Sequence, residues 1–188
     1  MKRSSPQQAA GIAGAVLGFV YLVTLAPGIT LWDAGEFASA VDSLGIPHPP
    51  GTPLFIVIAR AWHVVLGFLP TANATNLLSA VCTAVAAAVA AALVTRWTRD
   101  TFSGIAAALT LGGMSTVWLN ATETEVYSAS LLMSVLTGNL WRYAWLFGLG
   151  IQCLWLIWIY AAQAYGFLPL CLALFVIYTR NHMKWRTA

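Results

Sequence analysis

Long apolar runs separated by short polar breaks dominate the pattern of hydrophobic and polar positions along this chain. The runs that we interpret as membrane helices are residues 9–25, 76–94, 101–119, 126–141, 143–162 and 165–178. A helix needs about 20 apolar residues to cross a bilayer, and inside lipid it satisfies its own backbone hydrogen bonds. The pattern therefore predicts an all-α fold, a polytopic membrane bundle of about six transmembrane helices.

The composition leads to the same class of protein. The 188 residues are 60% hydrophobic and only 8% charged, and the mean hydropathy is +0.77. A soluble domain carries about 25% charged residues, so this chain has too few charges to cover a surface that faces water. Its net charge of +3 is scattered and forms no basic stripe, so the expected partner is a lipid bilayer and not a nucleic acid.

Basic residues set the expected orientation. Lys2 and Arg3 precede the first apolar run and hold the N-terminus in the cytoplasm. This run could also be a cleaved signal peptide. No small-x-small cleavage site follows it, and residues 27–33 read as ordered structure, so we interpret it as an uncleaved first helix. Residues 27–75 then form a loop on the exterior face.

Residues 53–69 lie within this loop and are apolar, but they include Arg60 and His63. If they span the membrane, the next span leaves Arg96 and Arg99 outside, against the positive-inside rule. If they lie flat in the headgroup region, the same two arginines are cytoplasmic. We therefore predict an interfacial helix in the first exterior loop.

The remaining segments then alternate across the membrane. The basic tail at residues 180–186 falls in the cytoplasm with the N-terminus, and every acid except Asp100 falls on the exterior. The loops are compact, and the three cysteines do not indicate a disulfide framework. These features favour a bacterial inner membrane.

Two carboxylates stand at the start of the exterior loop, in the motif at residues 32–37. Asp33 and Glu36 share one face if the segment is helical. Such a pair can do acid–base chemistry or hold a divalent metal. The alternative is a capping box, in which Asp33 caps the helix and Glu36 reaches back, and spacing alone favours the cap.

A proline-rich stretch, residues 47–53, follows on the same loop and carries His48. Prolines fix the backbone, and a rigid loop that aims a histidine is what a preorganised site needs. The alternative is a plain start to the next helix, with Thr52 as its cap and Pro53 in its first turn.

A third motif, residues 120–127, falls on the exterior face at the mouth of a membrane helix. Glu123 and Glu125 are two residues apart and do not share a helical face, so one can point to a site while the other serves the helix. Thr122 with Glu125 also fits a capping box. Arg60 is most simply an interfacial residue with its charge in the headgroups, and contact with a lipid phosphate is the minority interpretation.

Several motifs together, in order, resemble the N-terminal part of a known family. They are residues 21–22, 25–28, 32–37, 44–54, 76–80, 118 and 121–127. Over about residues 9–135 the chain resembles the protein O-mannosyltransferase-like GT-C glycosyltransferases.

The resemblance implies a membrane glycosyltransferase that moves a sugar, such as mannose, from a polyprenyl-phosphate donor to an acceptor hydroxyl, with protein Ser or Thr as one acceptor. It implies Asp33 as general base, with Glu36 assisting it or binding a metal. His48 is expected near the donor phosphate, and Glu123, Glu125 and Tyr127 in the same cavity. Inversion at the anomeric carbon is expected. No cofactor is assigned, and a divalent metal stays open as an alternative.

The resemblance stops near residue 136, and family members are much longer. We divide the chain into residues 1–136, a GT-C-like membrane region with a catalytic-type loop at 27–75, and residues 137–188, a two-helix membrane region that resembles the end of a different protein. The alternative function is a non-catalytic membrane protein: a truncated or fused remnant, a subunit that needs a C-terminal partner, or a small transporter-like bundle. The acids gather on one exterior face, which favours surface chemistry over transport.

Overall fold

The computed structural model describes residues 5–48, 52–138 and 143–186. The secondary structure in these residues is helical, with no strand among them, which confirms the all-α class. The helices are α1 (Pro6–Val23), α2 (Ala34–Ser43), α3 (Pro53–Val65), α4 (Thr71–Thr98), α5 (Thr101–Gly113), α6 (Ser115–Thr122), α7 (Val126–Gly138), α8 (Ala144–Ala161), the short 3-10 helix η1 (Tyr165–Phe167) and α9 (Leu168–Arg186).

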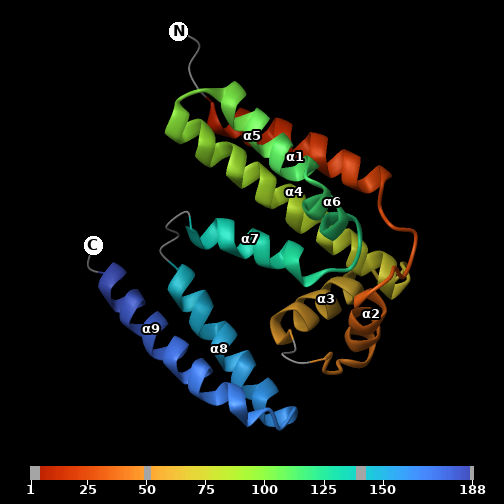
Figure 1. Ribbon diagram of the computed structural model, residues 1–188, viewed down its shortest axis with the longest axis vertical. Coiled ribbons are helices and arrows are strands. Elements are labelled where there is room, and N and C mark those ends of the chain that lie inside the picture. Colours follow the sequence, from red (N-terminus) through yellow and green to blue (C-terminus); the bar gives the residue numbers. More distant parts are fainter. Residues whose placement is uncertain (1–4, 49–51, 139–142, 187–188) are drawn as a thin grey trace.

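Helices α1, α4 and α5 pack side by side at one end of the molecule (Figure 1). Small residues let their backbones approach closely. A Cβ added to Gly14 of α1 would lie 3.1 Å from the Cβ of Ala88 in α4. One added to Gly104 of α5 would lie only 2.0 Å from Thr95 Oγ1. This packing leaves no room for larger side chains between the three helices.

The outer faces of these helices are apolar, whereas polar side chains lie inside. Helix α1 buries every fourth residue, at Ala9, Ala13, Leu17 and Tyr21. Its exposed apolar residues are Ile12, Val16, Phe19, Leu22 and Val23. Helix α4 buries Thr75, Asn76, Ser79, Thr83 and Thr95. An apolar surface of this extent requires a lipid or protein cover, and the chain is a membrane protein.

Fewer helices meet the criteria for a membrane span than the sequence pattern predicted. Helices α1 and α4 are each long and apolar enough to cross a membrane, and α5 with α6 is a third candidate if the bent pair is one span. Helix α7 has 13 residues and is about 20 Å long, against a hydrocarbon core of about 30 Å. All six predicted segments contain helix, but among the described residues only two or three spans are supported, and six are not confirmed.

The segment predicted as one helix over residues 101–119 is broken. Helices α5 and α6 meet at Met114 with a bend of 71°. Tyr21 of α1 donates a buried hydrogen bond of 2.8 Å to the carbonyl of Gly112, which lies in the last turn before the break. The ring of Tyr21 also packs edge-to-face on Trp118 of α6. Helix α1 therefore supports both halves of the bent segment.

Helices α2 and α3 fold against the N-terminal part of α4 (Figure 1). Phe37 of α2 and Phe55 of α3 meet edge-to-face, with ring centroids 5.5 Å apart, and Trp62 donates a 2.9 Å hydrogen bond to the carbonyl of Ala74. Pro53 occupies the first turn of α3 as predicted, but Thr52 makes no side-chain capping bond. With 13 residues α3 is short for a span; its interfacial placement stays a prediction.

Helices α8 and α9 form an antiparallel pair at the other end of the molecule (Figure 1). Their contact buries Trp158 and Ile159 of α8 with Cys171 of α9. Helix α8 also contacts α3 and α7. The C-terminal region therefore lies against the helices that surround the predicted site.

Candidate active site

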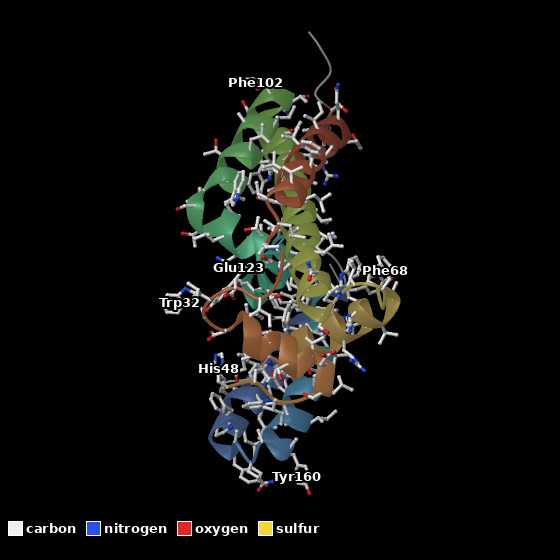
Figure 2. All side chains as sticks on the ribbon, turned by 90° about the vertical axis from the view of Figure 1, so that its right-hand side faces the viewer. Trp32, His48, Phe68, Phe102, Glu123 and Tyr160 are labelled. Carbon is white, nitrogen blue, oxygen red and sulfur yellow. The ribbon has the colours of Figure 1, made fainter. Side chains whose placement is uncertain are left out.

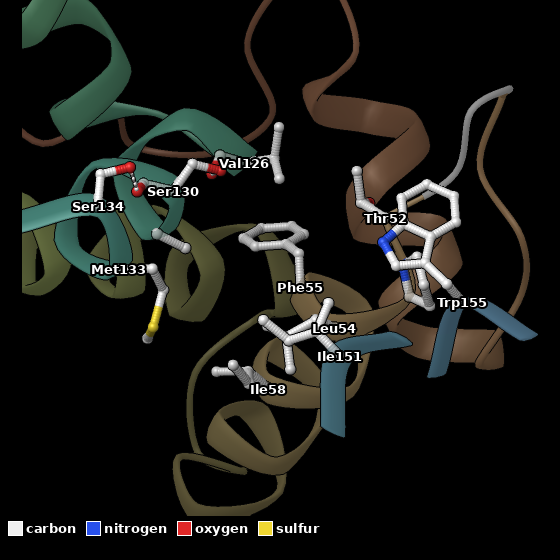
Figure 3. A pocket seen from close by; sticks show the side chains of 12 residues that line it. Thr52, Leu54, Phe55, Ile58, Val126, Ser130, Met133, Ser134, Ile151 and Trp155 are labelled. Atoms are coloured by element: carbon white, nitrogen blue, oxygen red, sulfur yellow. Dashed lines mark hydrogen bonds between the residues drawn. The ribbon is translucent and has the colours of Figure 1, made fainter. Parts of the chain in front are cut away.

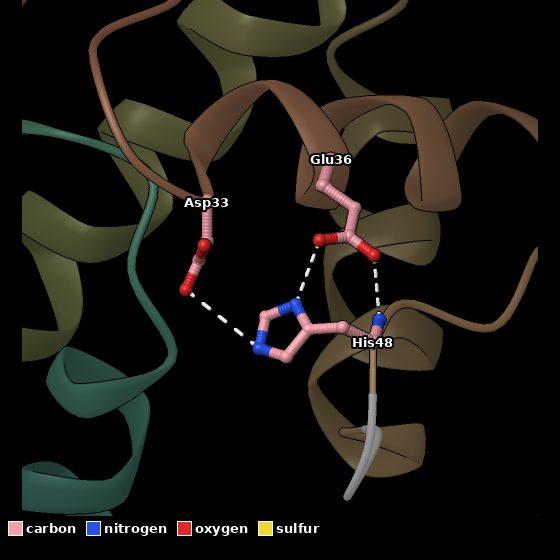
Figure 4. A group of neighbouring side chains, drawn as sticks. All are labelled: Asp33, Glu36 and His48. Carbon is pink, nitrogen blue, oxygen red and sulfur yellow. Dashed lines mark hydrogen bonds and ion pairs between the residues drawn. The ribbon is translucent and has the colours of Figure 1, made fainter.

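Glu36 holds His48 at two points. Oε2 of Glu36 lies 2.7 Å from Nδ1 of the ring, and Oε1 accepts the backbone N–H of His48. On the other side of the ring, Oδ2 of Asp33 lies 3.7 Å from Nε2 (Figure 4). Asp33 immediately precedes α2 and Glu36 lies in its first turn, while His48 comes from the loop after this helix. The structure thus brings these three predicted residues into one cluster.

These contacts change the acidity of the pair. The hydrogen bonds from His48 lower the pKa of Glu36, with the positive charge of the ring as a smaller cause. The hydrogen bond to Glu36 raises the pKa of His48, and the charges of Glu36 and Asp33 add to it. His48 therefore keeps its proton at higher pH than a free imidazole. The cluster presents an imidazole ring between two carboxylates that favour its protonated form.

The capping interpretation of both acidic motifs is wrong. Asp33 stands at the N-cap of α2, but its side chain makes no capping hydrogen bond, and Glu36 turns to His48 instead of back to the helix start. Thr122 ends α6 and donates to the carbonyl of Trp118. Helix α7 begins only at Val126, so Thr122 cannot pair with Glu125 in a box. The side chains of Asp33 and Glu36 therefore have no helix-capping role, whereas the Glu125 carboxylate accepts the backbone N–H of Val126 at the start of α7.

A cavity of about 290 Å³ joins the motifs at residues 32–37 and 47–53 to the motif at residues 120–127. Its lining residues are Asp33, Phe37, His48, Thr52, Glu125, Val126, Tyr127, Ser130 and Trp155. Four of the seven predicted site residues thus share one pocket, although they come from segments far apart in sequence. Burial raises the pKa of Glu125, and the negative charges of Glu123 and Asp33 raise it further.

The other predicted residues lie outside the lining of this pocket. Glu36 acts through His48, and Glu123 reaches the pocket only through its charge on Glu125. Figure 2 shows Glu123 and His48 on the same side of the molecule, with Phe68 on the opposite side.

Arg60 belongs to a separate cluster at the contact of α2 and α3. Its Nη1 donates to the carbonyl of Asp42 at 3.1 Å and lies 3.7 Å from the carboxylate of the same residue. His63 and Thr71 also contact that carboxylate, at 3.6 Å and 2.9 Å. The structure therefore does not bring Arg60 to the pocket, and its partners are structural.

A second, apolar cavity of about 350 Å³ adjoins the first (Figure 3). Thr52, Val126, Ser130 and Trp155 line both cavities. Helices α3, α7 and α8 supply the remaining wall of the apolar cavity, through Pro53, Leu54, Phe55, Ile58, Ala129, Met133, Ser134 and Ile151. A charged pocket thus borders an apolar one across a shared edge.

The cluster around His48 also fits a metal ion. One ligand atom each from Asp33, Glu36 and His48 lie within 4.8 Å of one another. Two carboxylate oxygens and one imidazole nitrogen form a donor set suited to a borderline divalent cation such as Zn²⁺ or Mn²⁺. The divalent metal left open by the sequence would be held by these residues.

Residue patterns did not indicate two residues in the wall of the pocket. Phe37, Thr52 and Val126 lie in the motifs singled out from the sequence, but Ser130 lies outside them, and Trp155 lies in the C-terminal region that the sequence did not connect with the site. No spacing signal connects Trp155 to Asp33, because only tertiary packing places α8 beside α3.

Comparison with known proteins supports the resemblance. No solved structure gives a significant match. The chain is 31% identical over 134 residues to "Protein O-mannosyl-transferase TMEM260" of Mus musculus, which covers 69% of this chain and 19% of the mouse protein. It is 24% identical over 111 residues to "Protein O-mannosyl-transferase tmem260" of Dictyostelium discoideum, covering 58% of this chain and 14% of that protein. The matched region thus spans about a fifth of the length of the mouse protein and a smaller share of the Dictyostelium protein.

Both relatives are eukaryotic, so they do not support the bacterial inner membrane expected from the sequence. The sequence model of one family matches residues 33–185, which is most of the chain. This range starts at the first acid of the candidate site and continues past residue 136, where the resemblance was expected to stop, through α8 and into α9. The chain belongs to the family described as the protein O-mannosyl-transferase TMEM260 N-terminal domain.

Proposed function

We propose that this chain carries the catalytic-loop part of a membrane glycosyltransferase of the GT-C type. In this proposal a sugar, with mannose as the first candidate, moves from a polyprenyl-phosphate donor to a hydroxyl group of a protein acceptor. The observation that carries the proposal is the single pocket lined by Asp33, His48, Glu125 and Tyr127. The names of the relatives support the sugar and the protein acceptor.

The adjoining apolar cavity supports the choice of a lipid-linked donor. A polyprenyl phosphate has a long apolar chain and a charged head, and each part needs a different environment. The apolar cavity can hold the start of the chain, while the phosphate lies across the shared edge near His48. The hydrogen bond to Glu36 raises the pKa of His48, which favours the protonated ring that can pair with this anion.

Asp33 is the proposed general base. Its side chain is half exposed and reaches the pocket, without a capping bond to occupy it. The acceptor oxygen forms a bond to the anomeric carbon, and its proton passes to the Asp33 carboxylate. The bond from that carbon to the phosphate oxygen breaks, and the phosphate leaves with the electron pair, beside His48. Attack opposite the leaving phosphate inverts the anomeric centre.

Glu125 and Tyr127 would bind hydroxyl groups of the sugar. A partly buried carboxyl with a raised pKa accepts hydrogen bonds when ionised and can also donate one when protonated. For topology we propose that both termini face the cytoplasm and that residues 27–75 and 120–125 face the opposite side, with α3 at the interface.

The test is sugar transfer from polyprenyl-phosphate mannose to a Ser/Thr peptide, in membranes that contain this chain. We expect wild-type transfer to fall at least 100-fold in Asp33→Asn. Asp42→Asn is the matched control, because Asp42 is an acid of the same loop that lies outside the pocket. If correctly folded wild-type protein transfers no sugar from any polyprenyl-phosphate donor, the chain alone is not the enzyme, and a non-catalytic remnant or a subunit that needs a partner is left.

A further inference from the structure

The two halves of the acidic pocket come from two loops that lie far apart in the sequence. Asp33 follows the loop that leaves α1, and Glu125 lies in the loop between α6 and α7. The distance between Asp33 and Glu125 must stay fixed if both are to contact one substrate, because catalysis is sensitive to a misplacement of about 1 Å. The residues that hold the loops together lie behind the pocket, on the first turns of α4.

One side chain contacts both loops. Asn76 is completely buried, and its Nδ2 donates to the carbonyls of Ala26 at 3.0 Å and Gly28 at 2.9 Å. Its Oδ1 accepts a 2.6 Å hydrogen bond from the hydroxyl of Thr124. An amide whose nitrogen faces two carbonyls and whose oxygen faces a hydroxyl is satisfied in this orientation alone. Asn76 therefore connects the loop before Asp33 with the loop that carries Glu125.

A second contact orients Thr124. Its hydroxyl lies 2.6 Å from the hydroxyl of Thr75, and both residues are buried. Because a hydroxyl has one proton, Thr124 accepts from Thr75 once it donates to Asn76, and Thr75 then shares its own proton between Thr124 and the carbonyls of Thr71 and Ala72, each 3.0 Å away. One turn further along α4, Ser79 Oγ lies 3.2 Å from the backbone nitrogen of Glu125 and 3.4 Å from its carbonyl oxygen. Residues 75, 76 and 79 thus bind residues 124 and 125 along one face of the helix.

A direct backbone contact completes the connection. The amide of Ala26 donates to the carbonyl of Thr122 at 2.9 Å. The side chains of Thr75, Asn76, Ser79 and Thr124 are buried, and away from water an unpaired donor or acceptor is costly and hydrogen bonds are strong. The arrangement therefore has few alternatives of similar energy, which is the property that a positioning element needs.

We propose that Thr75, Asn76 and Thr124, which we call the buried polar cluster, are positioning residues that set Glu125 opposite Asp33 in the pocket. The proposal deepens the glycosyltransferase function and rests on it for its effect on turnover. Its structural part is independent of that function. It also assigns a role to residues 76–80, a motif for which the sequence analysis gave none.

The position of Glu125 can be measured through its titration. The titratable groups that face it are Asp33 and His48 across the pocket, Tyr127 on the same wall and Glu123 in its own loop. Burial and two of these charges raise the pKa of Glu125, so release of the loop into water must lower it. The infrared band of the protonated carboxyl, identified by its loss in Glu125→Gln, reports this pKa in the folded chain in lipid nanodiscs.

The decisive variant is Thr124→Val, which keeps the shape of the side chain and removes the hydroxyl. We expect the Glu125 band to disappear at lower pH than in wild type, and kcat for sugar transfer to fall roughly 10- to 100-fold, with a smaller change in the donor KM. Thr124→Ser restores the hydroxyl and is expected to restore both values. Thr83→Val is the matched control, because Thr83 is buried on the same helix and bonds only to its own turn.

A Glu125 titration that is the same in folded Thr124→Val as in wild type overturns the proposal. If this variant does not fold, Ser79→Ala makes the same test with a smaller change and must shift the band in the same direction. If wild type transfers no sugar, the infrared titration still decides the positioning role. The failure of the enzyme function and the failure of the cluster are therefore distinguishable.

Discussion

His48 Nδ1 lies 2.7 Å from Glu36 Oε2, and the same carboxylate also accepts the backbone N–H of His48. One acidic side chain thus fixes both the ring and the backbone of the histidine. Because Nδ1 is engaged by Glu36, Nε2 is the nitrogen left to face Asp33 and the pocket. The orientation and the charge of His48 have a common origin in Glu36.

Glu36→Gln should lower the pKa of His48 toward its ordinary value of about 6.5. The variant loses the charge-assisted hydrogen bond, which is the largest cause of the raised pKa. Protonated His48 is lost as pH rises through its pKa, so the alkaline limb of donor binding should move to lower pH in the variant. The ring titration can be followed by NMR of labelled histidine, with His48→Gln to assign the signal and Asp42→Asn as control. A His48 titration that does not move in Glu36→Gln would contradict this account of the cluster.

Arg60 and His48 can be compared as contacts of the donor phosphate. We expect His48→Gln to raise the donor KM about tenfold or more, as for loss of a charge-assisted hydrogen bond. Arg60→Gln should leave the KM within about twofold, because Arg60 pairs with Asp42 outside the pocket. If Arg60→Gln raises the donor KM more than His48→Gln does, Arg60 and not His48 contacts the phosphate.

Trp155 should affect lipid-linked donors in particular. It lines both the acidic pocket and the apolar cavity, so Trp155→Ala removes apolar surface where the isoprenoid chain would begin. We expect the KM of a long-chain donor to rise about tenfold, and that of a short-chain analogue to change much less. Ile157→Ala, on the exposed side of the same helix, is the control. Equal effects of Trp155→Ala on both donors would argue against a lipid chain in this cavity.

The contact of α4 and α5 gives a prediction about stability. A Cβ at position 104 would meet Thr95 Oγ1 at 2.0 Å and the backbone oxygen of Ala91 at 2.5 Å, whereas one at Gly113 would have nothing within 4 Å. Gly104→Ala should therefore destabilise the fold by about 1–3 kcal/mol. Gly113→Ala, in the same helix, should be neutral or slightly stabilising. Thermal unfolding of both variants in one detergent measures the difference, and equal midpoints would show that the two helices can separate without loss.

The sequence predicted the all-α class and most of the helical segments, but not how many of them are long enough to span a membrane. Hydropathy located the helical segments other than α2, but it does not detect a break such as the one at Met114, because both halves of the broken segment are apolar. The residue types at positions 32–37, 48 and 125 indicated a site because charged groups are rare in this chain. The rarity of charged residues and their position in loops were enough to suggest a candidate site.

Distances between these groups could not be predicted. Spacing alone favoured a capping role for Asp33 and Glu36, and it could not show that His48, twelve residues after Glu36, offers the carboxylate a better partner. The separation of Arg60 from the pocket depends on Asp42, whose carboxylate lies beside it only after α2 and α3 pack. Contacts of this kind arise from tertiary structure and leave no periodic signal.

The bend at Met114 has a consequence for how this segment can vary in length. Helix α6 leaves the bend at 71° and ends at Thr122, whose carbonyl binds the amide of Ala26. Each residue added to a helix turns its end by about 100° and moves it about 1.5 Å. A single insertion between Met114 and Thr122 would therefore carry Thr122 away from Ala26. Substitutions can be absorbed in this stretch, but insertions and deletions cannot, so alignments of relatives should show no gap between the bend and Glu125.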